Sequence, residues 1–134
     1  MGWWDINNSE QKAWSLLKKW GFEIQQLDWI GRKNNNWTIF EIKERELFQP
    51  PPFLGTGLDK RQLYLRTELL NDKGLRTILL VYEKGTDKVY WQYIDVLEKG
   101  EYFDTKKKIR IYPIDNFKRI GIKKEKIRGE IWVH

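Results

Sequence analysis

The chain has 134 residues, a formal net charge of +6 at pH 7 and no cysteine. This length suits a single domain with one core, which we place over residues 1–134. The lack of cysteine excludes disulfides, thiol catalysis and cysteine-based zinc sites. The only histidine is the last residue, His134, so no Ser-His-Asp triad is expected. If the protein is an enzyme, we expect its catalysis to use a metal ion bound by acidic residues.

The sequence has neither the charged and then apolar pattern of a signal peptide nor an apolar run of about 18 residues that would span a membrane. We therefore expect an intracellular, cytoplasmic protein that is not secreted and has no membrane partner. The positive charge fits a polyanion, with nucleic acid as the first choice. Many small basic proteins bind no nucleic acid, so the charge alone leaves this partner open.

A helix is predicted from Glu10 to Trp20, because apolar residues recur there with helical spacing. The predicted buried stripe consists of Ala13, Trp14, Leu16, Leu17 and Trp20. Asn7, Asn8 and Ser9 precede the helix and favour its N-cap, and Gly21 ends it. Glu10 lies in the first turn, on or beside the core-facing side. It either reaches a site in the core or simply interacts favourably with the helix dipole.

A β-hairpin is predicted next, because the apolar-rich runs Phe22–Ile30 and Trp37–Glu44 flank a polar turn over residues 31–36. Side chains alternate along a strand, so Glu41 and Lys43 share one face of the second strand.

Asp28 joins that same face from the first strand. If residues 31–36 all belong to the turn, Asp28 lies opposite Ile39 and diagonally from Glu41. Two carboxylates and the Lys43 ammonium on one patch suit a hard divalent cation such as Mg²⁺. The alternative is an ordinary cross-strand ion pair on a solvated sheet face.

A proline-containing loop is predicted from Glu44 to Gly57, and a helix from Leu58 to Asp72. One face of this helix carries three leucines and one amide, in the order Leu58, Gln62, Leu65 and Leu69. Burying the Gln62 amide without a partner costs about 1–3 kcal/mol, so we expect a polar partner on the sheet. The alternative places Gln62 at the helix rim.

The apolar run Arg76–Glu83 predicts a central strand covered on both faces and joined to the hairpin by a right-handed crossover. Further strands are predicted over residues 89–96, around residues 109–112 and over residues 127–133.

The Asp28, Glu41-x-Lys43 pattern resembles the PD-(D/E)xK nuclease superfamily, and Glu10 and Gln62 match its flanking helices. The resemblance covers residues 8–96 and implies an α/β fold with a restriction-endonuclease-like αβββαβ core. That fold has a mixed central sheet with a helix on each side, and here extra C-terminal β-strands over residues 97–134. One core strand has no clear counterpart in the sequence.

The resemblance also implies a function, that of a metal-dependent DNA endonuclease that hydrolyses phosphodiester bonds. A structure-specific, junction-resolvase-like enzyme is one form of it. Asp28, Glu41 and Glu10 would hold Mg²⁺, or alternatively Mn²⁺. Lys43 would orient the attacking water or stabilise developing charge, and Gln62 would position Lys43 or a phosphate. Cutting both strands would need two active sites, which a homodimer would supply.

Basic residues from the hairpin turn, the central helix and the C-terminal third are the candidate DNA contacts. They are Arg32, Lys33, Lys60, Arg61, Lys106, Lys107, Lys108 and Arg110. The basic C-terminal segment continues with Lys118, Arg119, Lys123, Lys124, Lys126 and Arg128. A lysine-rich edge that guards against aggregation explains the same pattern without DNA.

Two readings without catalysis remain. In the first, the chain is a basic nucleic-acid-binding module that stacks bases on its Trp and Tyr side chains. In the second, it is an interaction domain of a mobile-element or phage assembly.

Overall fold

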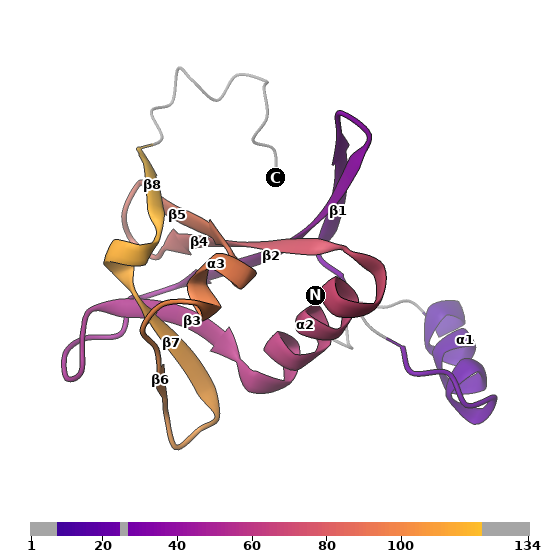
Figure 1. Cartoon of the computed structure of the whole chain (residues 1–134). Helices are drawn as coiled ribbons and strands as arrows, with labels where there is room; N and C mark the ends of the chain where they lie inside the picture. Colours follow the sequence, from indigo (N-terminus) through magenta and orange to yellow (C-terminus); the bar gives the residue numbers. More distant parts are fainter. Residues whose placement is uncertain (1–7, 25–26, 122–134) are drawn as a thin grey trace.

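The computed structural model describes residues 8–24 and 27–121, which form an α/β architecture with two sheets (Figure 1). The larger sheet has the strand order β1-β2-β4-β5-β8, and the smaller sheet has the order β3-β7-β6. The strands of the larger sheet are β1 (Trp29–Lys33), β2 (Asn36–Arg45), β4 (Arg76–Glu83), β5 (Lys88–Tyr93) and β8 (Lys118–Gly121). Those of the smaller sheet are β3 (Gly55–Asp59), β6 (Phe103–Asp104) and β7 (Ile109–Pro113). The helices are α1 (Asn8–Lys19), α2 (Lys60–Lys73) and α3 (Ile94–Glu98), with a 3₁₀ turn at Ile114–Asn116.

The β1–β2 hairpin is confirmed, but its predicted turn and register are wrong. Only two residues form the turn, Asn34 and Asn35, with φ angles of 51° and 66°. Asparagine tolerates this left-handed conformation, which a tight two-residue hairpin turn requires at both positions. Residues 31–33 therefore belong to β1, and Trp29 pairs with Phe40. The predicted strand over residues 22–30 starts too early, since residues 22–24 and 27–28 lie outside any strand.

The predicted crossover is confirmed: β2 and β4 pair in parallel, with Glu41 opposite Leu79, and α2 lies between them in the chain. Because β1 and β5 run antiparallel to these strands, the larger sheet is mixed. Burial alternates along β4, where Leu79 and Val81 are fully buried and Leu80 is half-buried. Contrary to the prediction that both faces of β4 are covered, only one face is fully buried in the described part of the chain.

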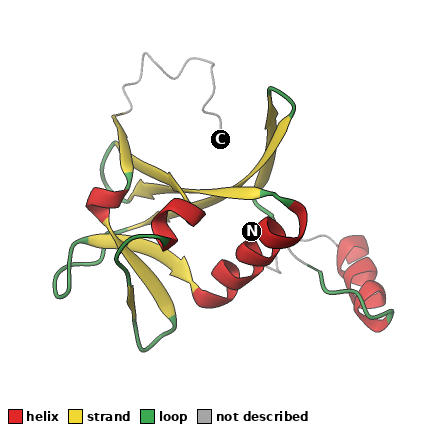
Figure 2. Ribbon diagram, viewed as in Figure 1, coloured by secondary structure: helices red, strands yellow, loops and turns green. Residues whose placement is uncertain are grey.

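Two faces of the larger sheet follow from this alternation. We call the side that bears Ile39, Leu79 and Val81 the α2 face, because α2 and α3 pack over it (Figure 2). The other side bears Phe40 and Ile78, which are half-buried, and we call it the open face. Within the described part of the chain, no helix packs on the open face.

The smaller sheet completes the core on the α2 face. Leu58 of β3 and Tyr112 of β7 are fully buried and join Leu79, Leu97 and Phe117 in one hydrophobic cluster. The strands β3 and β7 approach so closely that a methyl group on Gly57 would overlap the carbonyl oxygen of Arg110. Glycine at this position therefore permits strand pairing, whereas the sequence predicted a flexible loop.

The start of α2 follows from the same strand. The Asp59 side chain ends β3 and accepts a hydrogen bond of 2.8 Å from the backbone N–H of Gln62, so it caps the helix. Gly74 closes α2 in a left-handed conformation with φ of 70°. Leu58 lies outside the helix, and the residues that α2 buries are Leu63 and Arg66. The predicted face is therefore wrong in including Leu58, whereas Gln62, Leu65 and Leu69 all lie in α2 and are half-buried.

The predicted N-terminal helix is confirmed as α1, but its apolar stripe is not buried. Leu16 is 46% exposed and Trp20 is 64% exposed. In Figure 1, α1 lies at the right, separated from the two sheets and from α2.

The C-terminal third alternates short elements. The strand predicted over residues 89–96 ends at Tyr93, where α3 begins, and the strand predicted near residues 109–112 is confirmed as β7. The strand predicted over residues 127–133 lies outside the described residues. No helix among the described residues has the length and apolar character needed to cross a membrane.

Candidate functional site

The corrected hairpin register places Asp28 and Glu41 next to each other. The register ends at the Trp29–Phe40 pair, so Asp28 lies one residue before β1, where its negative charge acts on Glu41. Asp28 Oδ2 accepts a hydrogen bond of 2.9 Å from the backbone N–H of Ile42. This bond fixes the Asp28 carboxylate against β2, although Asp28 itself precedes β1.

Glu41 is only 2% exposed and both of its carboxylate oxygens accept hydrogen bonds. Oε1 accepts from Arg66, at 3.0 Å from Nε and 2.7 Å from Nη2. Oε2 accepts from Gln62 Nε2 at 3.2 Å. Burial is the largest influence on Glu41 and raises its pKa above the ordinary value; Arg66 opposes this shift, and the negative charge of Asp28 adds to it.

Lys43 lies two residues beyond Glu41, on the same face of β2. Its Nζ donates to Gln62 Oε1 at 2.9 Å and lies 3.9 Å from Glu41 Oε2. The side chain is 21% exposed, so the ammonium reaches the surface while Glu41 stays beneath it. The Gln62 amide therefore bridges the two, and this is the polar partner on the sheet that the sequence predicted for it.

Arg66 is a site residue that the sequence reading missed. It is 3% exposed and lies one helical turn beyond Gln62 on α2. A signal was available, since residues at i and i+4 share a helix face and Gln62 was already expected to point toward the sheet. A buried arginine requires an anionic partner, which Glu41 supplies.

Glu10 is an exposed residue of α1. Among the described residues, no group of three or more His, Cys, Asp and Glu side chains is placed to hold a metal ion. The structure thus brings Asp28, Glu41, Lys43 and Gln62 together and leaves Glu10 out of that group.

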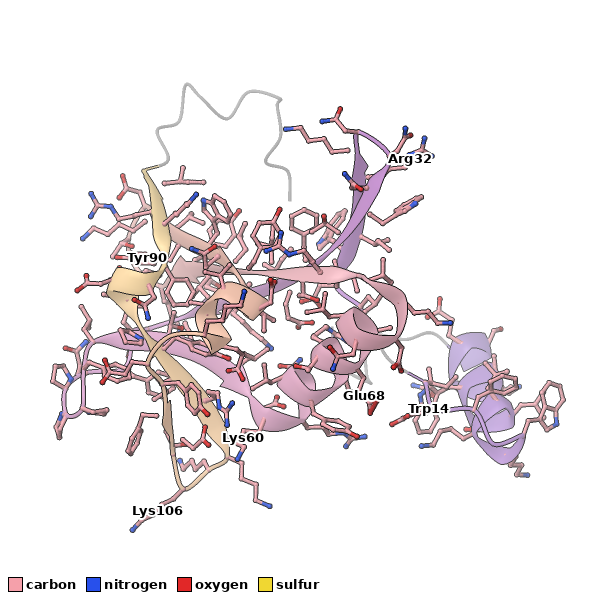
Figure 3. The ribbon with its side chains drawn as sticks, in the orientation of Figure 1. Trp14, Arg32, Lys60, Glu68, Tyr90 and Lys106 are labelled. Atoms are coloured by element: carbon pink, nitrogen blue, oxygen red, sulfur yellow. The ribbon has the colours of Figure 1, made fainter. Side chains whose placement is uncertain are left out.

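Two of the candidate DNA contacts lie at the tip of the β1–β2 hairpin. Arg32 and Lys33 are exposed there, and the Arg32 guanidinium lies 5.8 Å from the centre of the Trp37 ring (Figure 3).

A second group occupies the opposite end of the molecule, where Lys106 is labelled in Figure 3. Lys106, Lys107 and Lys108 are exposed in the turn between β6 and β7. The backbone N–H of Lys60 donates to the carbonyl of Lys108 at 2.9 Å, so this turn lies beside the start of α2. Arg61 is exposed at that same helix end.

Lys60 and Arg110 are engaged within the protein. Lys60 Nζ lies 3.2 Å from Asp104 Oδ2. Arg110 contacts Asp104 and Glu98, each at 2.8 Å, and its side chain is 14% exposed. These pairs hold β6 and α3 to β7. Contacts of either residue with DNA would have to compete with them.

The four site residues offer a defined chemistry. The carboxylates of Asp28 and Glu41 present oxygen atoms that can bind a metal ion. The Lys43 ammonium, which the Gln62 amide holds, can donate to an anionic group.

Comparisons with protein-family models, curated proteins and solved structures found no match for this chain.

Proposed function

We propose that the protein is a metal-dependent nuclease that hydrolyses phosphodiester bonds in DNA. The observation that carries the proposal is the contact of Gln62 with both Glu41 and Lys43, beside Asp28, which accepts from the Ile42 N–H between them. These residues come from the start of the hairpin, from β2 and from α2, which the chain order of the PD-(D/E)xK superfamily would bring together. The parallel pairing of β2 and β4 on either side of α2 supports the same restriction-endonuclease-like core.

The donor set fits a hard divalent cation. Mg²⁺ is usually held by one or two carboxylates and keeps several of its waters. Asp28 and Glu41 supply two such carboxylates, and the Ile42 carbonyl between Glu41 and Lys43 is a further oxygen donor. When bound, the cation lowers the pKa of a water ligand and neutralises charge on the phosphate. Mg²⁺ is the expected ion and Mn²⁺ an alternative.

Lys43 supplies the positive charge that the protein itself brings to the reaction. Its ammonium is held by Gln62 Oε1 and remains 21% exposed. A donor fixed in this way stabilises negative charge that develops on a phosphate oxygen, without first having to reorganise. Gln62 is a positioning residue, because its amide connects Lys43 with Glu41.

The exposed basic residues support DNA as the substrate. Arg32 and Lys33 lie at one end of the protein, and the turn over residues 106–108 lies at the other. Lys and Arg side chains that neutralise backbone phosphates supply affinity without reading sequence. If both strands of a duplex are cut, a homodimer would provide the second site.

A second candidate is a nucleic-acid-binding module without catalysis. The observation that favours it is the Arg66–Glu41 pair, which satisfies Glu41 through its 2.7 Å contact without any metal. In that case Asp28 and Lys43 are ordinary polar residues, and binding is indifferent to divalent cations.

A cleavage assay separates the two candidates. Linear, single-stranded and four-way-junction DNA are incubated with wild type and Lys43→Ala, in Mg²⁺ and in EDTA. Lys84→Ala is the matched control, because Lys84 is an exposed lysine of the β4–β5 turn, three residues beyond Val81, the strand partner of Lys43, and does not belong to the group around Gln62. Cutting that requires metal, vanishes in Lys43→Ala and survives in Lys84→Ala supports the nuclease. Binding without cutting on every substrate supports the second candidate.

A further inference from the structure

A groove lies on the open face of the larger sheet and extends along the β1–β2 hairpin toward its tip. Its volume is about 490 Å³, which falls within the range of small-molecule binding sites. The lining residues are Gly31, Arg32, Lys33, Asn34, Asn36, Thr38, Phe40, Ile78 and Tyr93. Side chains alternate along β2, so Phe40 faces this groove while its neighbour Glu41 faces the candidate active site. The groove is therefore a separate site.

Lys33 is the cation of the groove, and the lining contains no aspartate or glutamate. Arg32 also lines the groove, but its guanidinium lies over the Trp37 ring, on the opposite face of the hairpin. Asn34 and Asn36 add side-chain amides at the same rim, where both residues are exposed. The rim thus offers an ammonium and hydrogen-bonding groups to an anionic ligand.

The floor of the groove is aromatic. Phe40 and Tyr93 are half-buried, and Ile78 lies in the groove with them. The Arg76 guanidinium lies 3.6 Å from the centre of the Tyr93 ring, and Asp95 holds that guanidinium through hydrogen bonds of 3.1 and 3.0 Å. The Tyr93 ring is therefore held in a fixed orientation before any ligand arrives.

Gly31 keeps space open above the floor. A Cβ atom at this position would lie 3.2 Å from Cε2 of Phe40, so a larger side chain would press on the ring. A half-buried strand position without a side chain, directly beside an aromatic ring, leaves the ring accessible to a flat group.

We propose that this groove binds an unpaired stretch of nucleic acid, with a base over Phe40 and Tyr93 and the adjoining phosphate at Lys33. Aromatic side chains that stack bases and cations that follow the backbone are the two components of single-strand binding sites. In a duplex the bases are stacked on one another, so the floor is unavailable to them. The proposal requires neither metal nor cleavage and is therefore independent of the proposed nuclease.

The test measures binding in EDTA, by fluorescence anisotropy of labelled oligonucleotides of equal length. The four probes are single-stranded DNA, single-stranded RNA, an abasic strand and duplex DNA. We expect the base-containing single strands to bind about tenfold more tightly than the abasic strand, because base stacking contributes about 1–3 kcal/mol. The DNA and RNA arms identify which sugar the site prefers. Equal affinity for the abasic strand, or tighter binding of duplex, would overturn the proposal.

Variants locate the binding to the groove. Phe40→Leu and Tyr93→Leu should each lower single-strand affinity about tenfold, whereas Tyr64→Leu, at a 62% exposed tyrosine of α2, should leave it unchanged.

Lys33→Ala changes only one exposed side chain at the hairpin tip, so it keeps the test valid if an aromatic variant fails to fold. Loss of one phosphate contact should reduce the slope of log affinity against log salt by about 0.7. Lys84→Ala is the control for the charge change. Groove variants that bind as tightly as the controls would refute the site.

Discussion

The buried pair between Arg66 and Glu41 leads to a quantitative prediction. Both side chains are at most 3% exposed and their closest atoms are 2.7 Å apart. Removing one partner of a buried pair typically costs about 3–5 kcal/mol, because the other charge stays buried without compensation. We therefore expect Arg66→Met to lower the free energy of unfolding by about 3–5 kcal/mol. Replacing both partners, with Arg66→Met and Glu41→Leu together, should cost much less than the sum of the two single changes.

The measurement is urea unfolding of the two single variants, the double variant and a control. Lys60→Ala is the control, because the Lys60–Asp104 pair is 45% and 33% exposed and such pairs contribute about 0–1 kcal/mol. A cost of Arg66→Met as small as that of Lys60→Ala would refute the reasoning. So would strict additivity of the two single changes, since it would mean that the buried charges do not interact.

Other variants test the proposed chemistry and the packing. Lys43→Met should reduce metal-dependent cleavage about 100-fold or more while changing urea stability by less than about 1 kcal/mol; equal cleavage would exclude Lys43 from the reaction. Asp28→Asn keeps an oxygen for the Ile42 N–H, so it should fold normally but bind Mn²⁺ at least tenfold more weakly by calorimetry. Burial raises the pKa of Glu41, and a metal ligand must be deprotonated to bind. Mn²⁺ affinity should therefore be full above the pKa of Glu41 and fall as the pH drops through it, and this fall should begin above pH 4.5, the ordinary pKa of the group. A fall in affinity only at lower pH would contradict this prediction. Gly57→Ala should destabilise the fold by about 3 kcal/mol or more, because its methyl group overlaps the β7 backbone; an unchanged melting temperature would show that the strands can separate.

The sequence predicted the elements that carry their own local signals. Helical spacing predicted α1, and the apolar run over residues 76–83 predicted β4 at the bounds that the structure shows. The convergence of Asp28, Glu41, Lys43 and Gln62 was also predictable, because strand alternation and chain order place them on one face. Whether they perform catalysis is not encoded in such patterns, and the cleavage assay tests it.

The errors arose where distant parts of the chain decide the outcome. The predicted turn contained too many residues because Gly31 resembles a turn residue, although in the structure it lies in β1 beside the Phe40 ring. Gly55 and Gly57 resemble a flexible loop, and only the close approach of β7 explains why they are buried in a strand. Arg66 was missed because a charged residue is expected on the solvent side of a helix unless its partner is already known.

The pairing of β3 with β7 has a consequence for how the chain folds as it is synthesised. Asp59, the last residue of β3 and the cap of α2, pairs with Ile109, which is made fifty positions later. Chains grow from the N-terminus at about 5–20 residues per second, so the residues of α2 are synthesised several seconds before β7 is complete. During this interval Leu58 has no β7 to cover it. We therefore expect nascent or shortened chains that end before residue 109 to be cleaved readily by proteases, whereas the finished chain is resistant.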